Sequence, residues 1–205
     1  MDLSYSTGNI FPVPIHVFDI KDFKLYQKDL IDYAYTLKSK DTDTPKRSNV
    51  GGWQSRTFHL NDGSDKLHSL LMDCITSLPS LKIDINLYVK ACVNINSPDS
   101  FNVQHSHPGC DLSGVLWIKC PKDCGIIVFD TPTSFQSHNE INSYVDNFRK
   151  QNNVFHSYYF NPTEGRMLIF PAHLNHHVKE NKSNEDRISV SFNIFFKQTI
   201  HITLT

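Results

Sequence analysis

The sequence predicts a mainly β domain, a β-sandwich or jelly roll with N-terminal helices packed on one sheet. Two observations indicate this fold class. Apolar residues recur at helical spacing only in the first 80 residues, whereas short strand-like runs separated by turn signals follow from residue 81. Many strands after two helices are typical of a sheet layer backed by helices. The 205 residues suit one domain over 1–205, with 1–80 as helical support and 81–198 as the jelly-roll core.

The N-terminal elements follow from local patterns. Residues 10–20 mix apolar residues with two prolines, which predicts an extended strand at a sheet edge. The spacing of apolar residues predicts amphipathic helices over 21–38 and 64–78, the second capped by Ser64 and ended by a proline. The polar segment 39–56, which contains a Gly-Gly pair, predicts a loop between them.

Alternating and apolar runs predict the strands of the second part. The expected strands are 85–96, 101–107, 112–120, 125–130, 154–160, 166–171, 175–179 and 187–198. The segment 132–152 is polar, poorly patterned and long for a plain connection. It predicts a lid or an excursion near a functional site.

Composition excludes several classes of protein. The formal net charge of −1 offers no global attraction to nucleic acid or to an anionic membrane. No apolar run approaches the roughly 20 residues needed to cross a bilayer, and the first residues do not resemble a signal peptide, so a cytoplasmic location is expected. The odd number of cysteines indicates free thiols rather than disulfides, and Cys120 with Cys124 lacks the second pair of a zinc knuckle. The sequence leaves it open whether the protein forms a homodimer.

Several of the 11 histidines lie in a pattern that metal sites use. His105 and His107 are two residues apart on an expected strand, which would place both imidazoles on one face. His176 follows a buried-type strand and suits a third ligand. On a strand His177 would face away from His176, and His173 is expected in a loop. A His-x-His pair by itself is also common as a surface or partly buried polar pair, and the third histidine favours a metal site with His105, His107 and His176.

Arg187 and Ser189 share one face of the last expected strand, and the alternate positions on that strand are apolar. A guanidinium is a planar fork that pairs with a carboxylate, and a hydroxyl can add a hydrogen bond. The polar face of this strand meets either solvent or a cavity. Trp117 and Phe170 are candidates for pocket walls or for plain core residues.

The order of these motifs resembles that of the 2-oxoglutarate and Fe(II)-dependent oxygenases. The pattern is His-x-His, a Ser-Gly-Val strand, Gly-Arg-Met-Leu-Ile-Phe-Pro, His-x-Val and Arg-x-Ser-x-Ser-Phe-Asn. It is similar in particular to a group common in phage and marine bacterial genomes, whose further motifs appear here as Gly51-Gly-Trp-Gln-Ser55, Val93-Asn-Ile95 and Leu112-Ser-Gly-Val115. The resemblance covers roughly residues 50 to 196.

The resemblance implies a double-stranded β-helix, Fe(II) as the metal and 2-oxoglutarate as co-substrate. His105, His107 and His176 would hold the iron, and Arg187 with Ser189 would bind the far carboxylate of 2-oxoglutarate. The implied activity is that of a dioxygenase, with hydroxylation of a small-molecule or peptide substrate as the default outcome. For a phage-encoded protein the compartment would be the host cytoplasm.

One position departs from the family pattern. The usual non-haem iron site has two histidines and a carboxylate, whereas His107 stands where Asp or Glu is expected. Three histidines are the favoured set. The alternatives are that Asp111 supplies a carboxylate, or that water replaces His107 as a ligand. Zinc or nickel would also suit three imidazoles. Two other classes stay open: a cupin-like three-histidine enzyme without 2-oxoglutarate, and a non-catalytic jelly-roll binding module.

Overall fold

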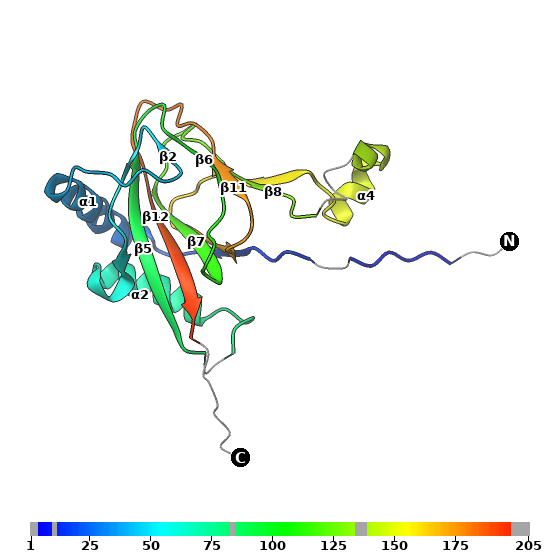
Figure 1. The fold of residues 1–205 in the computed structure, drawn as a ribbon, viewed down its shortest axis with the longest axis horizontal. Helices are drawn as coiled ribbons and strands as arrows, with labels where there is room; N and C mark the ends of the chain where they lie inside the picture. The colour runs from blue at the N-terminus through cyan, green and yellow to red at the C-terminus, as the bar shows by residue number, and fades with distance from the viewer. Residues whose placement is uncertain (1–3, 10–11, 83–84, 134–138, 198–205) are drawn as a thin grey trace, which may run out of the picture.

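The computed structural model of the protein describes residues 4–9, 12–82, 85–133 and 139–197. Its centre is a pair of antiparallel β-sheets (Figure 1). The larger sheet has seven strands in the order β1 (His16–Asp19), β10 (Arg166–Pro171), β7 (Leu112–Lys119), β12 (Arg187–Phe196), β5 (Leu87–Asn96) and β3 (Trp53–Gln54), with β4 (Phe58–His59) also paired to β5. The smaller sheet has five, in the order β2 (Asn49–Val50), β6 (Phe101–His105), β11 (His176–Val178), β8 (Ile127–Asp130) and β9 (Ser157–Phe160).

Two helices, α1 (Lys24–Lys40) and α2 (Asp65–Thr76), lie beside the larger sheet, on the left of Figure 1. Each helix buries one stripe of apolar side chains, as its spacing predicts. The main core is formed by these stripes and the helix-facing side of the sheet, and it includes Leu30, Ala34, Leu67, Leu71, Ile75, Val93, Ile95, Val190 and Ile194. The predicted jelly roll with helices packed on one sheet is confirmed.

The two long neighbouring strands β5 and β12 have faces of opposite character. Their register pairs Ile95 with Ile188 and Val93 with Val190, and these apolar residues are fully buried in the main core. Since side chains alternate along a strand, the intervening positions point away from the helices. Those positions are mostly polar, and they line a cavity between the two sheets: Lys90, Cys92, Asn94, Asn96, Arg187, Ser189, Ser191 and Asn193. The polar face of the last strand therefore meets a cavity and not bulk solvent.

The expected strands of the second part all appear, most of them shortened by one to three residues at an end. The residues at 10–11 and from 198 onward lie outside the described part. In the expected opening strand only β1 is regular, and it lies at the edge of the larger sheet, as its prolines predict.

The expected loop 39–56 is wrong in part, because it contains β2 and β3. These two-residue strands have no local signal. They exist because their backbones pair with distant strands, Trp53 opposite Ile95 and Asn49 opposite Asn102.

The described part of the segment 132–152 does not have the expected role near the site. Its described part holds a 3-10 turn (Asn139–Ser143) and the short helix α4 (Asp146–Gln151), and residues 134–138 lie outside the described part. Figure 1 shows α4 beyond the far end of β8, away from β12 and β5. None of the described residues of 132–152 lines the cavity that holds the histidines.

Candidate metal centre

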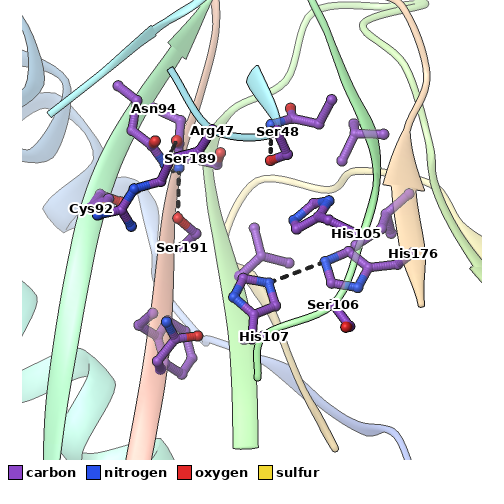
Figure 2. A pocket seen from close by; sticks show the side chains of 18 of the residues that line it. Arg47, Ser48, Cys92, Asn94, His105, Ser106, His107, His176, Ser189 and Ser191 are labelled. Atoms are coloured by element: carbon purple, nitrogen blue, oxygen red, sulfur yellow. Dashed lines mark hydrogen bonds between the residues drawn. The ribbon is translucent and has the colours of Figure 1, made fainter. Parts of the chain in front are cut away.

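Three histidines from the smaller sheet and its margin converge at one point (Figure 2). His105 is the last residue of β6 and lies opposite His176, the first residue of β11. His107 lies beyond the end of β6, where its backbone N–H donates to the carbonyl of Ala172 at 2.8 Å. The prediction that His105 and His107 lie on one strand is therefore wrong, since the strand has ended by residue 107. The chain nevertheless turns the His107 ring toward the other two.

The distances between the rings suit one metal ion. The ring centroids are 5.1 Å apart for His105 and His107, 4.4 Å for His105 and His176, and 5.2 Å for His107 and His176. One ligand nitrogen from each ring lies within 4.8 Å of the others, and the Nε2 atoms of His107 and His176 are 3.4 Å apart. Two nitrogens at about 2.1 Å from one ion, at the 90–110° angles of common coordination, would be separated by about 3.0–3.4 Å.

Backbone contacts orient two of the rings. Nδ1 of His105 lies 2.8 Å from the carbonyl oxygen of Val103, and Nδ1 of His176 lies 2.9 Å from that of Leu174. A carbonyl can only accept, so each Nδ1 carries the proton and donates. Each Nε2 then presents its lone pair, which is the arrangement that outer contacts impose on histidine ligands.

The three rings are held in the neutral form that a metal requires. Burial lowers the pKa of His107 to about 4 and that of His176 to about 3. Repulsion from neighbouring histidines adds to both shifts, and Arg47 also contributes to that of His107. Burial also lowers the pKa of His105. All three imidazoles are therefore unprotonated at neutral pH.

No carboxylate joins this cluster among the described residues. Asp111, the alternative ligand, uses its Oδ2 to accept the backbone N–H of Phe196 at 2.8 Å. His173 is exposed in the turn before β11. His177 lines a different cavity from His176, as the alternation of side chains along a strand predicts. The sequence-based choice of His176 over His177 agrees with this geometry.

Arg187 is a buried cation without a carboxylate partner among the described residues. Its side chain is at the start of β12, the residue is 2% exposed, and its Nη1 donates to the carbonyls of Cys124 at 2.6 Å and Gly125 at 3.2 Å. Burial lowers the pKa of Arg187, which reflects the unfavourable removal of the charge from water. A guanidinium in this position is ready for an anionic ligand.

The histidines and Arg187 line the same cavity of about 470 Å³, which is within the range of small-molecule sites. Ser189 lies beside Arg187 on the cavity face of β12, as its spacing predicts. Trp117 and Phe170 line the cavity and also belong to a small buried apolar cluster, so both roles considered for them apply. The predicted site residues are thus brought together.

A network of hydrogen-bonded polar side chains also lines this cavity, and the sequence did not predict it. Gln54 Nε2 donates to Asn94 Oδ1 at 3.0 Å, and Asn94 Nδ2 donates to Ser191 Oγ at 3.0 Å. The Oε1 atom of Gln54 is buried and has no hydrogen-bond partner in the described structure. The alternation of polar and apolar residues along β5 could have predicted that Asn94 faces the cavity. The position of Gln54 depends on the short strand β3 pairing with β5, which has no local signal.

The cysteines form no second metal site in the described part of the chain. All five are free thiols, as the odd count indicates. Cys120 and Cys124 are not part of any group of side chains that could hold a metal ion there.

The fold and the site together define a jelly-roll protein with a histidine cluster and a buried arginine in one cavity. A model of the family described as "Putative 2OG-Fe(II) oxygenase" matches residues 90–193, which is half of the chain. The chain belongs to this family of 2-oxoglutarate and Fe(II)-dependent dioxygenases. Membership implies Fe(II) and 2-oxoglutarate as cofactor and co-substrate.

Solved structures share the fold at low sequence identity. A prolyl-4-hydroxylase from Pseudomonas putida is 13% identical, with a TM-score of 0.62 over 90% of this chain and 93% of that one. The carbocyclase SnoK from nogalamycin biosynthesis is 9% identical, with a TM-score of 0.60 over 88% and 78%. A Trichoplax adhaerens prolyl hydroxylase, in complex with a hypoxia inducible factor peptide fragment, is 11% identical, with a TM-score of 0.57 over 88% and 83%.

A search of curated protein sequences finds no match. In the described part of the chain, no helix has the length and apolar character required to span a membrane.

Proposed function

We propose that the protein is a hydroxylase-type oxygenase in which His105, His107 and His176 bind Fe(II), and Arg187 with Ser189 binds 2-oxoglutarate. One observation carries this assignment. The ligand nitrogens of three neutral imidazoles and a buried guanidinium without a carboxylate partner line one cavity, among the residues that the structure describes. A metal cation and a dicarboxylate would satisfy both groups.

The donor set fits Fe(II) chemically. Imidazole nitrogen is a suitable ligand for iron, and three residues leave open positions for a chelating co-substrate and oxygen. The set differs from the usual two histidines and one carboxylate, since His107 supplies a neutral nitrogen. The site therefore carries one more positive charge than the usual one, and bound 2-oxoglutarate partly offsets it.

When bound, Fe(II) and 2-oxoglutarate would activate O2, so that one of its oxygen atoms enters a C–H bond of the substrate and the other enters succinate, with release of CO2. The chain provides binding and orientation. Arg187 holds the distal carboxylate of 2-oxoglutarate and Ser189 adds a hydrogen bond, which fixes the direction of the oxo acid. Trp117 and Phe170 exclude water from one wall of the cavity.

Hydroxylation is the reaction that we assign, and its substrate is a small molecule or a peptide. Two of the similar structures are prolyl hydroxylases, which supports this outcome. The same fold also occurs in a carbocyclase, so the outcome depends on how the substrate is placed in the cavity. We also propose a cytoplasmic location and a relationship to the group with the motifs Gly51-Gly-Trp-Gln-Ser55 and His-x-His-Pro.

Anaerobic reconstitution with Fe(II) and 2-oxoglutarate tests the proposal. The expected result is a weak visible charge-transfer band, followed by succinate formation when oxygen is admitted. Bound iron without this band when 2-oxoglutarate is added would contradict the proposal. A cupin-like enzyme would keep its turnover in the Arg187→Gln variant, and a non-catalytic module would not bind iron tightly.

A further inference from the structure

The charged side chains of the cavity are all positive among the described residues that line it. They are Arg47, Lys90 and Arg187, and neither Asp nor Glu is present with them. The whole chain has 20 Lys and Arg against 21 Asp and Glu, so this excess of positive charge is local. A cavity lined by one sign of charge attracts ligands of the opposite sign.

Lys90 lies far along the sheet from Arg187. The register of β12 and β5 places Arg187 opposite Asn96 and Asn193 opposite Lys90. Six residues separate Lys90 from Asn96, which corresponds to about 20 Å along the strand. The five carbons of 2-oxoglutarate, joined by bonds of about 1.5 Å, span only about 5 Å. A co-substrate held by Arg187 therefore leaves Lys90 free for a second ligand.

Arg47 belongs to the same region of the cavity as Lys90. Figure 2 shows Arg47 on the side that carries Cys92, Asn94 and Ser191, across from the histidines. Burial raises the pKa of Cys92, and the positive charge of Arg47 acts against that rise; the same charge also lowers the pKa of His107, so Arg47 is within electrostatic range of both side chains. Cys92 is two residues from Lys90 on the same face of β5, about 7 Å along the strand.

Neither cation is neutralised by the part of the protein that the structure describes. Neither Arg47 nor Lys90 forms an ion pair there with a carboxylate. The Nζ atom of Lys90 lies over the rings of Tyr88 and Phe195, 5.9 and 5.6 Å from their centroids. These rings are stacked on each other and restrict the lysine without cancelling its charge.

We propose that Arg47 and Lys90 form a substrate subsite for an oxyanion, a carboxylate, phosphate or sulfate group, separate from the Arg187 subsite for 2-oxoglutarate. The substrate of this oxygenase is then an anionic small molecule whose charged group is held away from Arg187, while the group to be oxidised faces the histidines. This inference rests on the proposed function, because it takes Arg187 as the anchor for 2-oxoglutarate.

Inorganic phosphate is a direct probe of the subsite. The full-length ¹⁵N-labelled protein, loaded with diamagnetic Zn(II) and saturated with 2-oxoglutarate, is titrated with phosphate at constant ionic strength and followed by NMR chemical shifts. Saturable shifts are expected around Arg47 and Lys90. Arg47→Gln and Lys90→Gln should each weaken phosphate binding at least fivefold, and the double variant should abolish it. Lys46→Gln is the matched control, since Lys46 is next to Arg47 and exposed like it, but does not line the cavity.

Binding of 2-oxoglutarate separates the two proposals. It should be unchanged in Arg47→Gln and Lys90→Gln and weakened in Arg187→Gln. If wild-type protein fails to bind 2-oxoglutarate, the proposed function fails; phosphate titration of the Zn(II)-loaded protein without 2-oxoglutarate, compared with the Arg47→Gln and Lys90→Gln variants, then still tests the subsite. Three results would overturn the subsite: no saturable phosphate shifts in the wild type, equal phosphate binding in the double variant, or competition between phosphate and 2-oxoglutarate.

Discussion

Replacement of Arg187 by methionine should separate its binding role from its contribution to folding. Methionine keeps most of the apolar stem of the side chain, is about two atoms shorter and carries no charge. Removal of one partner from a buried, hydrogen-bonded charge pair costs about 2–5 kcal/mol of binding free energy. At 1.4 kcal/mol per factor of ten, the affinity for 2-oxoglutarate should fall by roughly 30-fold to several thousand-fold.

The stability of the ligand-free protein should change far less. Arg187 makes no ion pair with a carboxylate among the described residues, and burial of its charge is already unfavourable. Methionine relieves that penalty and loses only the hydrogen bonds to the carbonyls of Cys124 and Gly125. The expected change in the free energy of unfolding is within about 1 kcal/mol.

Two measurements decide this prediction. Calorimetric titration of the Mn(II)-loaded protein gives the affinity for 2-oxoglutarate, and urea denaturation of the metal-free protein gives its stability. Arg187→Lys is the matched control, since it keeps the charge and loses the planar fork, and it should retain part of the affinity. Unchanged affinity combined with strong destabilisation would refute the reasoning and make Arg187 a structural residue.

Three further predictions follow from the site and its scaffold. His176→Ala should lower metal affinity at least 100-fold by calorimetry, whereas His177→Ala should leave it unchanged, because His177 lines another cavity; equal losses would contradict the assignment. The metal-free protein should lose stability as pH falls from about 6.5 to 4. Above pH 6.5 the buried rings are neutral in both states, whereas below it the unfolded chain takes up protons that folded His107 and His176, with pKa values of about 4 and 3, do not. Each ring should contribute about 3 kcal/mol to this loss. His107→Gln should flatten the dependence of the free energy of unfolding on pH, measured by urea denaturation. An unchanged dependence would argue against burial of His107. Gly114→Ala should destabilise the protein by about 1–3 kcal/mol or more in the same assay, since the added Cβ would lie 2.3 Å from Phe192 Cζ and 2.6 Å from the carbonyl oxygen of Leu168; unchanged stability would show that the sheet can shift there.

Local patterns were sufficient for most of the elements and for the members of the site. Periods of about 3.6 and 2 residues are visible in the sequence because they reflect burial along a single element. The helix over 21–38 corresponds to α1, and the strand 166–171 matches β10 residue for residue. The sequence motifs also identified the site residues His105, His107, His176 and Arg187, because each has a recognisable position in its motif.

The sequence by itself determined which side chains are available for metal and oxo-acid binding. Only the tertiary structure decided how they meet. His107 joins the cluster from beyond the end of β6, and Asp111 is drawn to the backbone of Phe196 and not to the cluster. Arg47 reaches the same cavity as Lys90 from a loop that precedes it by more than 40 residues. The positions of these residues relative to one another depend on pairing between strands distant in the chain, and the local spacing of residues does not predict that pairing.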